Sequence, residues 1–269
     1  MTRKELFRNL LVQANEKGLF VGTGNPEANI LIVGKEASIA GDNKEQIDLE
    51  IKANIALWMR DIDKQPSEIE NCIITAEINN FSPLYPYKGQ VKKRDSRIRN
   101  PNAAYNWGTS PTWLNYQKLR DAILETNSEV INFHENVFIT ELNQITSRYS
   151  SYQDNDNGER ERMIVKRQNI IFSSGYIKSF PVVILACGAY IAEHRIDVGT
   201  VFGVEQNPQE KCVPGNPRQW YKMYRNLSGN PPKLVIHTRQ LSLNITDALL
   251  GMVGKDVADF CIKNNISLE

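Results

Sequence analysis

The chain has 269 residues, of which 41% are hydrophobic and 23% are charged, and its formal net charge is +1 at pH 7. This length and composition indicate one folded domain with a sizeable core and exclude a disordered chain. The small net charge excludes a globally basic nucleic-acid binder but leaves room for a local basic patch. No apolar run reaches the length of a membrane span, and the four cysteines form no CxxC pair that would favour a metal site.

Short apolar runs and helical patterns alternate along the chain. The charged start, MTRKELFRNLLVQANEKG, indicates a helix rather than a signal peptide. Four β-branched runs are too short for buried helices and predict strands at 28–33, 137–142, 181–186 and 233–236. Apolar spacing predicts helices at 47–60, 113–124, 160–172, 189–194 and 246–253. The alternation predicts an α/β fold with three α/β/α layers around a mostly parallel, four-stranded sheet.

Two stretches, at about 81–109 and 202–230, are rich in Pro, Gly and polar residues, and we expect both to be long loops of a single domain that covers 1–269. Loops of this length in a compact domain usually serve a function. The absence of paired cysteines favours a reducing, cytoplasmic compartment.

Polar residues follow each predicted strand. Glu36 follows the first, the second ends with Glu141, Leu142 and Asn143, Gly188 follows the third and His237 the fourth. Parallel sheets bind ligands beyond the carboxyl ends of their strands, so we expect these groups to meet at one edge. A carboxylate, an amide and an imidazole together suit acid–base chemistry or the stabilisation of developing charge.

Five short segments, in order along the chain, resemble motifs of the uracil-DNA glycosylase superfamily. The first, GKEAS at 34–38, is similar to the family's G-Q-D-P-Y, and the last, HTRQLS at 237–242, is similar to H-P-S-P-L-S. Between them, FSP at 81–83 resembles F-S-V-P, SPTWLN at 110–115 resembles P-P-S-L-x-N, and VVILACGAY at 182–190 resembles the apolar strand that ends in W-G-x-Y.

The resemblance implies a metal-free and cofactor-free enzyme that flips a base out of single- or double-stranded DNA and cleaves its bond to the sugar. It implies catalytic roles for Glu36, which would stabilise the sugar cation, and His237, which would donate to the departing base. The remaining implied residues fall into two groups. Those that would bind the base are Gly34, Lys35, Ser38, Phe81, Glu141 and Asn143. Those that would bind the nucleic acid are Ser82, Ser110, Gly188, Arg239, Leu241 and Ser242, of which Leu241 would be the wedge that fills the gap in the stack.

The chain departs from the family's motifs at several of these positions. Glu36 replaces an Asp or Asn, and Ser38 stands where the best-known branch has a Tyr, which leaves space for a base larger than uracil. Thr238 and Arg239 replace Pro and Ser. Because the alignment slips by two residues after the second strand, either Glu141 or Asn143 could read the base.

A basic segment at 88–99 holds six cationic residues against one acid and is flanked by aromatic residues. Lys92, Lys93 and Arg94 at its centre could track phosphates while the aromatic residues stack on bases, or the segment could be a solvated loop.

Three functions follow from these observations. The leading one is a monomeric DNA glycosylase that acts on uracil or another modified base and has no membrane partner. The alternative is a nucleic-acid-binding module of the same fold with little or no catalysis. A third is an enzyme that acts on free nucleosides. Abasic sites in base-modified DNA distinguish the first from the second, and activity on nucleosides identifies the third.

Overall fold

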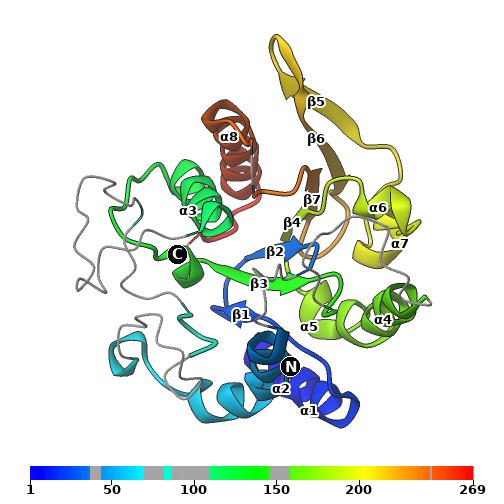
Figure 1. The fold of residues 1–269 in the computed structure, drawn as a ribbon. Helices are drawn as coiled ribbons and strands as arrows, with labels where there is room; N and C mark the ends of the chain where they lie inside the picture. Colours follow the sequence, from blue (N-terminus) through cyan, green and yellow to red (C-terminus); the bar gives the residue numbers. More distant parts are fainter. Residues whose placement is uncertain are drawn as a thin grey trace.

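The computed structural model describes residues 1–36, 44–69, 82–86, 92, 110–145, 158–242 and 244–268. Within these ranges the chain has an α/β fold (Figure 1). In chain order its elements are α1 (Arg3–Lys17), β1 (Thr23–Gly24), β2 (Ile30–Gly34), α2 (Lys44–Asp61), the 3-10 turn η1 (Pro66–Glu68), α3 (Pro111–Leu124), the 3-10 turn η4 (Phe133–Glu135), β3 (Val137–Glu141), α4 (Glu159–Arg167), the π-helical turn η5 (Gln168–Phe172), α5 (Gly175–Lys178), β4 (Val182–Ala186), α6 (Tyr190–Glu193), α7 (Val198–Phe202), β5 (Gln209–Val213), β6 (Asn216–Asn226), β7 (Lys233–Thr238) and α8 (Asp247–Lys263).

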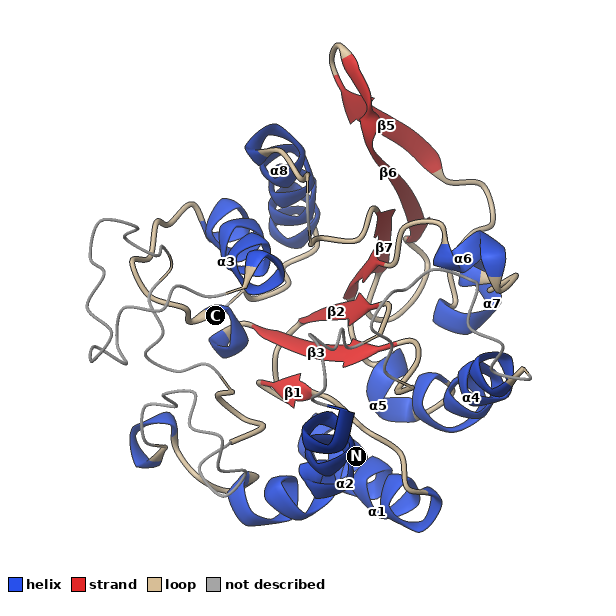
Figure 2. Ribbon diagram, viewed as in Figure 1, coloured by secondary structure: helices blue, strands red, loops and turns tan. Residues whose placement is uncertain are grey.

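A seven-stranded sheet in the order β1-β3-β2-β4-β7-β6-β5 runs through the molecule (Figure 2). The neighbours β3, β2, β4 and β7 are parallel. At one side of the sheet β1 pairs antiparallel with β3, and at the other side β6 pairs antiparallel with β7 and with β5. The four apolar runs of the sequence are therefore strands, and the predicted α/β class is confirmed. The expected four-stranded sheet is too small, because antiparallel strands extend it to seven.

Helices pack on both faces of this sheet because the central strands are apolar on both sides. In β4, Val182 and Ile184 join the core cluster beneath α3 and α8. Val183 and Leu185 point the other way, into the cluster formed with α1, α2, α4 and α5. Figure 1 shows α3 and α8 side by side on one side of the sheet and α1, α2, α4 and α5 on the other.

The predicted helix at 113–124 is confirmed as α3, and its first turn has the expected capping. The Ser110 hydroxyl accepts a hydrogen bond from the amide of Trp113 at 3.4 Å, and Pro111 occupies the first helical position. The final helix continues to Lys263, well past the predicted end at residue 253. Gly254 on α8 lets the two helices approach closely, since a Cβ there would lie 2.6 Å from the Cβ of Ala122 on α3.

The prediction of a long loop at 202–230 is wrong, because β5 and β6 form a hairpin in this stretch that projects from the sheet (Figure 1). Gly215, with φ +75°, provides the left-handed conformation of its turn. Pro217 is tolerated in β6 because it lies at the register shift between β5 and β6, where it has no paired residue, and β6 pairs with β7 only from Tyr221 onward.

Candidate functional site

The candidate site lies at the carboxyl ends of the parallel strands. From β2 the chain continues to β3 on one side and later to β4 on the other, so the sheet's switch point lies between β2 and β4. The register aligns Val33, Leu185 and His237, which places Glu36 and His237 at the same end of the sheet. Two strand spacings, or about 10 Å, separate β2 from β7. The strand register thus brings these strand ends to the same end of the sheet.

Glu36 follows β2 and is held by two residues that are distant in the sequence. Its Oε2 accepts hydrogen bonds from Nη1 of Arg160 on α4 at 2.6 Å and from the hydroxyl of Tyr190 on α6 at 3.2 Å. Burial opposes the charge of Arg160, but the Glu36 carboxylate outweighs it and raises the Arg160 pKa. Glu36 is therefore an ion-paired carboxylate, and its other oxygen, Oε1, is buried and finds no hydrogen-bond partner among the residues that the structure describes.

Asn143 connects the end of β3 to this ion pair. Its Nδ2 donates to the Tyr190 hydroxyl at 3.1 Å, and its Oδ1 accepts from the amide of Ile145 at 2.9 Å. Both ends of the Asn143 amide thus bond to the protein itself. Lys35 lies over the face of the Tyr190 ring, with Nζ 4.8 Å from the ring centroid. Of the two residues that could read a base, Asn143 is the one whose hydrogen bonds are already made.

Glu141, the last residue of β3, lies opposite Gly34 on β2. A Cβ on Gly34 would stand 2.2 Å from Oε2 of Glu141, so the carboxyl group fits over the strand only because residue 34 is a glycine. This Oε2 is buried, and no described residue forms a hydrogen bond with it. Burial raises the Glu141 pKa to about 8, Arg167 opposes the rise, and the negative charge of Glu36 adds to it. At neutral pH this raised pKa favours the neutral carboxylic acid form of Glu141.

Arg167, at the end of α4, is fully buried and clamps the strands behind Glu141. It donates to the backbone oxygens of Glu141 and Phe20 and, at 2.9 Å, to the hydroxyl of Thr140. Burial lowers the Arg167 pKa to about 10, which leaves its guanidinium charged at neutral pH. Two further titratable groups, the Tyr116 hydroxyl and the Cys187 thiol, interact electrostatically with Glu141, and burial raises the pKa of both.

His237 lies on the far side of the switch point and has its own protein partner. Its Nε2 is 2.8 Å from the backbone oxygen of Gly188, and because a carbonyl only accepts, Nε2 carries the proton. Burial lowers the His237 pKa more than this hydrogen bond raises it, so the ring is neutral at pH 7. Gly188 has φ +55°, a left-handed conformation that favours glycine. The ring N–H of His237, predicted to donate to a base, therefore already donates to the backbone of the loop after β4.

The segment after β7 is built into the fold. Leu241 is only 1% exposed and belongs to the core cluster beneath α3 and α8, so it does not project as a wedge. Asn115 of α3 donates to the backbone oxygen of Ser242 at 3.0 Å. Arg239 donates to the backbone oxygens of Arg218 at 3.0 Å and Asn244 at 3.4 Å.

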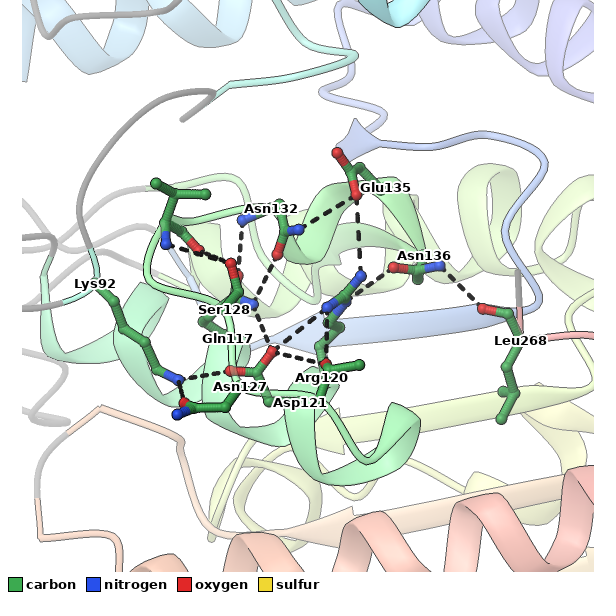
Figure 3. Close-up of polar contacts among 12 residues, drawn as sticks. Lys92, Gln117, Arg120, Asp121, Asn127, Ser128, Asn132, Glu135, Asn136 and Leu268 are labelled. Atoms are coloured by element: carbon green, nitrogen blue, oxygen red, sulfur yellow. Dashed lines mark hydrogen bonds and ion pairs between the residues drawn. The ribbon is translucent and has the colours of Figure 1, made fainter.

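Lys92, predicted to contact phosphates, is part of a polar network around α3 (Figure 3). Its Nζ lies 2.6 Å from Oδ2 of Asp121 and 3.1 Å from Oδ1 of Asn127, and its side chain is 13% exposed. Gln117 and Arg120 extend the same network to the loop before β3. The interpretation of Lys92 as a free phosphate contact is wrong for this conformation, because a nearly buried aspartate already pairs with it.

Ser38, Phe81, Lys93 and Arg94 lie outside the described residues, so their predicted roles stay predictions. Ser82 is described, and it is buried at 3% exposure beside the core rather than presented at the surface. The next residue, Pro83, accepts a hydrogen bond from the amide of Gly24 at 2.7 Å, which fixes this short piece next to β1.

No protein-family model, no curated protein and no solved structure matches this chain. In the described part of the chain, no group of three or more His, Cys, Asp or Glu side chains is placed to hold a metal ion. None of the helices in these same ranges is long and apolar enough to cross a membrane.

Proposed function

We propose that this protein is an N-glycosidase that releases a base from a DNA strand. One observation carries the proposal: two carboxyl groups lie at the same end of the sheet, and each has a buried oxygen without a hydrogen-bond partner among the described residues. Glu36 is a carboxylate paired with Arg160, and Glu141 is a neutral acid with a pKa of about 8. A carboxylate held by a cation and a buried carboxyl group without one can divide the roles of anion and acid between them.

Each carboxyl group then has a task in the reaction. When the bond between the sugar carbon and the base nitrogen breaks, its electron pair goes to the base and positive charge develops on the sugar. The Glu36 carboxylate stabilises that cation, and Glu141 gives its proton to the departing base. Water adds its hydroxyl to the sugar carbon, and the proton that water loses restores the Glu141 acid.

Two unpartnered oxygens support a ligand at this edge. Oε1 of Glu36 and Oε2 of Glu141 are buried and have no hydrogen-bond partner within the described ranges. Buried polar atoms are rarely left so, because each unmade hydrogen bond lowers stability, and a substrate would supply the missing partners. The Glu36 side chain is only 2% exposed, so the substrate must displace the groups that cover it before the two can touch.

DNA is favoured as the substrate by the ordered segments that resemble the uracil-DNA glycosylase superfamily. Gly34, Glu36, Gly188 and His237 of those segments lie at the carboxyl edge of the parallel strands, where ligands of such sheets bind. The side-chain amide of Asn143 is already bonded to Tyr190 and Ile145, so Asn143 positions the Tyr190 hydroxyl that donates to Glu36. Glu141 is then the residue that contacts the base.

The second candidate is a nucleic-acid-binding module that does no chemistry. Two contacts favour it: Arg160 neutralises Glu36 at 2.6 Å, and the backbone oxygen of Gly188 occupies the donor of His237 at 2.8 Å. Both weaken the stabilisation of charge that a glycosidase requires. Such a module would bind DNA and leave every base in place.

The experiment uses single- and double-stranded oligonucleotides that each carry one uracil, hypoxanthine or alkylated base, with abasic sites detected by alkaline cleavage. We expect base release by the wild type and a loss of about 10²–10³ in rate for both Glu36→Gln and Glu141→Gln, with DNA affinity retained. Glu16→Gln, on the exposed side of α1, is the matched control and should match the wild type.

The other outcomes are decisive as well. DNA binding without release of any base identifies the binding module. Base release that persists in both variants assigns the chemistry to other residues.

A further inference from the structure

The β5–β6 hairpin has two different faces because strand side chains alternate. Gln219, Tyr221 and Met223 of β6 are 4%, 1% and 3% exposed. Tyr221 and Met223 belong to the core cluster with α8, and the Tyr221 hydroxyl donates to Asp256 on that helix. This face of the hairpin is therefore buried against the core and α8.

The alternate residues Arg218, Trp220 and Lys222 point the other way and reach solvent in part. Trp220 connects them to the site, because its ring packs edge-on against His237 with 5.1 Å between the centroids. Arg239 lies next to Arg218, bonded to its backbone oxygen at 3.0 Å. We call Arg218, Trp220, Lys222 and Arg239 the hairpin stripe.

The hairpin stripe carries three cationic groups against one carboxylate, Glu210. Glu210 pairs with Lys222 at 2.5 Å, but the two side chains are 67% and 34% exposed, so the pair is weak and easily exchanged. No carboxylate among the described residues pairs with the guanidinium of Arg239, which donates to carbonyl oxygens, or with that of Arg218. Carbonyl partners leave the positive charge of Arg239 uncompensated.

On the opposite face of the hairpin, the cationic side chain of Lys211 is paired with a carboxylate. Lys211 lies 2.8 Å from Oδ2 of Asp256 on α8. The face that leads to His237 therefore carries three cationic groups around a partly accessible indole, and among the described residues only Lys222 of these three pairs with a carboxylate. Alternating cations and an aromatic ring are typical of surfaces that bind a single nucleic-acid strand, where cations contact phosphates and the ring stacks on a base.

We propose that the hairpin stripe binds the single DNA strand that flanks the base held at the sheet edge. Arg218, Lys222 and Arg239 contact successive phosphates, and the indole of Trp220 stacks on an unpaired base. This inference rests on the nucleic-acid partner of the proposed function but not on its chemistry. A paired duplex would not satisfy the stripe, because its base faces are already stacked within the helix.

The test measures binding of an unmodified, fluorescently labelled oligothymidylate by anisotropy over a series of salt concentrations. The double variant Arg218→Ala/Lys222→Ala removes two phosphate contacts. We expect its affinity to fall at least tenfold and its log–log salt slope to become shallower by about 1.4, at roughly 0.7 per contact. The control Lys52→Ala/Lys263→Ala removes the same charge from exposed positions on α2 and α8 and should bind as the wild type does.

Trp220 gives a second, charge-free measurement. Trp220→Ala should weaken binding of the oligothymidylate roughly tenfold, while Trp220→Phe, which keeps a stacking ring, should restore most of the affinity. Thermal melting of each variant verifies that it is folded. Equal affinity of the stripe variants and the wild type, an equal loss in the Lys52/Lys263 control, a stronger affinity for duplex than for single strand, or no binding by the wild type would each overturn the inference.

The base-release assay separates this inference from the proposed function. If stripe variants lose single-strand binding while the wild type releases no base, the hairpin stripe stands and the N-glycosidase chemistry fails. If the wild type releases base and stripe variants bind normally, the chemistry stands and the hairpin stripe has no role in binding.

Discussion

Two polar clusters in this molecule are satisfied to different extents. Around α3, the carboxylate of Asp121 accepts hydrogen bonds from Lys92 at 2.6 Å and from Gln117 at 2.9 Å, and both of its oxygens are used (Figure 3). At the carboxyl ends of the strands, Glu36 and Glu141 each keep one buried oxygen that has no partner in the described part of the chain. Among the described residues, the first cluster uses both oxygens of its carboxylate, and the second leaves one oxygen of each carboxyl group unbonded.

This difference separates a structural network from a candidate site. A fully bonded polar network stabilises one arrangement of the chain, and its pairs are lost together when one member is removed. A partly bonded network lowers stability and persists where function requires it. Mutations in the two clusters should therefore have different effects. In the first cluster they should lower the free energy of unfolding, and in the second they should change its pH dependence and the rate of base release.

The largest effect on stability is expected from Asp121→Ala in the α3 network. Removing this nearly buried carboxylate leaves the Lys92 ammonium, 13% exposed, without its charge partner, which should lower the free energy of unfolding by about 3–5 kcal/mol in a urea titration. Asp247→Ala is the matched control, because Asp247 pairs with Lys118 but is 79% exposed, and it should cost at most about 1 kcal/mol. Equal losses for the two variants would show that the α3 network is no more than surface charge.

Glu141→Gln should change how stability depends on pH. The folded pKa of Glu141, about 8, lies above its unfolded value of about 4.3, so the fold favours the protonated form. The resulting stabilisation is complete below the unfolded pKa and is lost as the pH rises to about 8, at roughly 1.4 kcal/mol per pH unit.

Glutamine keeps the shape of the neutral acid and does not titrate. Relative to this variant, the wild type should therefore lose stability steadily from about pH 4.5 to pH 8, as measured by urea titrations at each pH. A stability difference that is independent of pH would mean that Glu141 is ionised in the folded protein.

A smaller effect is expected from Gly34→Ala. The added methyl group would lie 2.2 Å from Oε2 of Glu141 and must push the carboxyl group off the strand, at a cost of about 1–3 kcal/mol in thermal or urea unfolding. Gly251→Ala is the control, because a Cβ at this position in α8 meets nothing within 4 Å, and it should stabilise the helix by about 0.5–1 kcal/mol. If both substitutions stabilise the protein, Glu141 does not pack on Gly34.

Local sequence patterns predicted the parts of the fold that depend on local physics. The β-branched runs became the four parallel strands, and Ser110-Pro111 started α3 as expected. The composition of residues 202–230 does not predict the hairpin, because their Pro and Gly content is typical of a loop. The alternation of buried Gln219, Tyr221 and Met223 was the signal for a strand there.

The candidate site was predictable only in outline. The strand ends placed Glu36, Glu141 and His237 at one edge, but the partners of Glu36 lie 124 and 154 positions away in the sequence, at Arg160 and Tyr190. No local pattern reports contacts over such distances. For the same reason the motif after β7 did not reveal that Leu241 faces the core.

The central claim is that Glu141 is a neutral acid beside an ionised Glu36, and carbon-13 NMR of the glutamate side-chain carboxyl groups tests it most directly. In a pH titration we expect one glutamate carboxyl to titrate near pH 8 and its signal to vanish in Glu141→Gln, which assigns it. The Glu16→Gln control should leave that signal unchanged. If every glutamate carboxyl of the folded wild type titrates below about pH 5.5, within the ordinary range for glutamate, the claim and the division of roles built on it are contradicted.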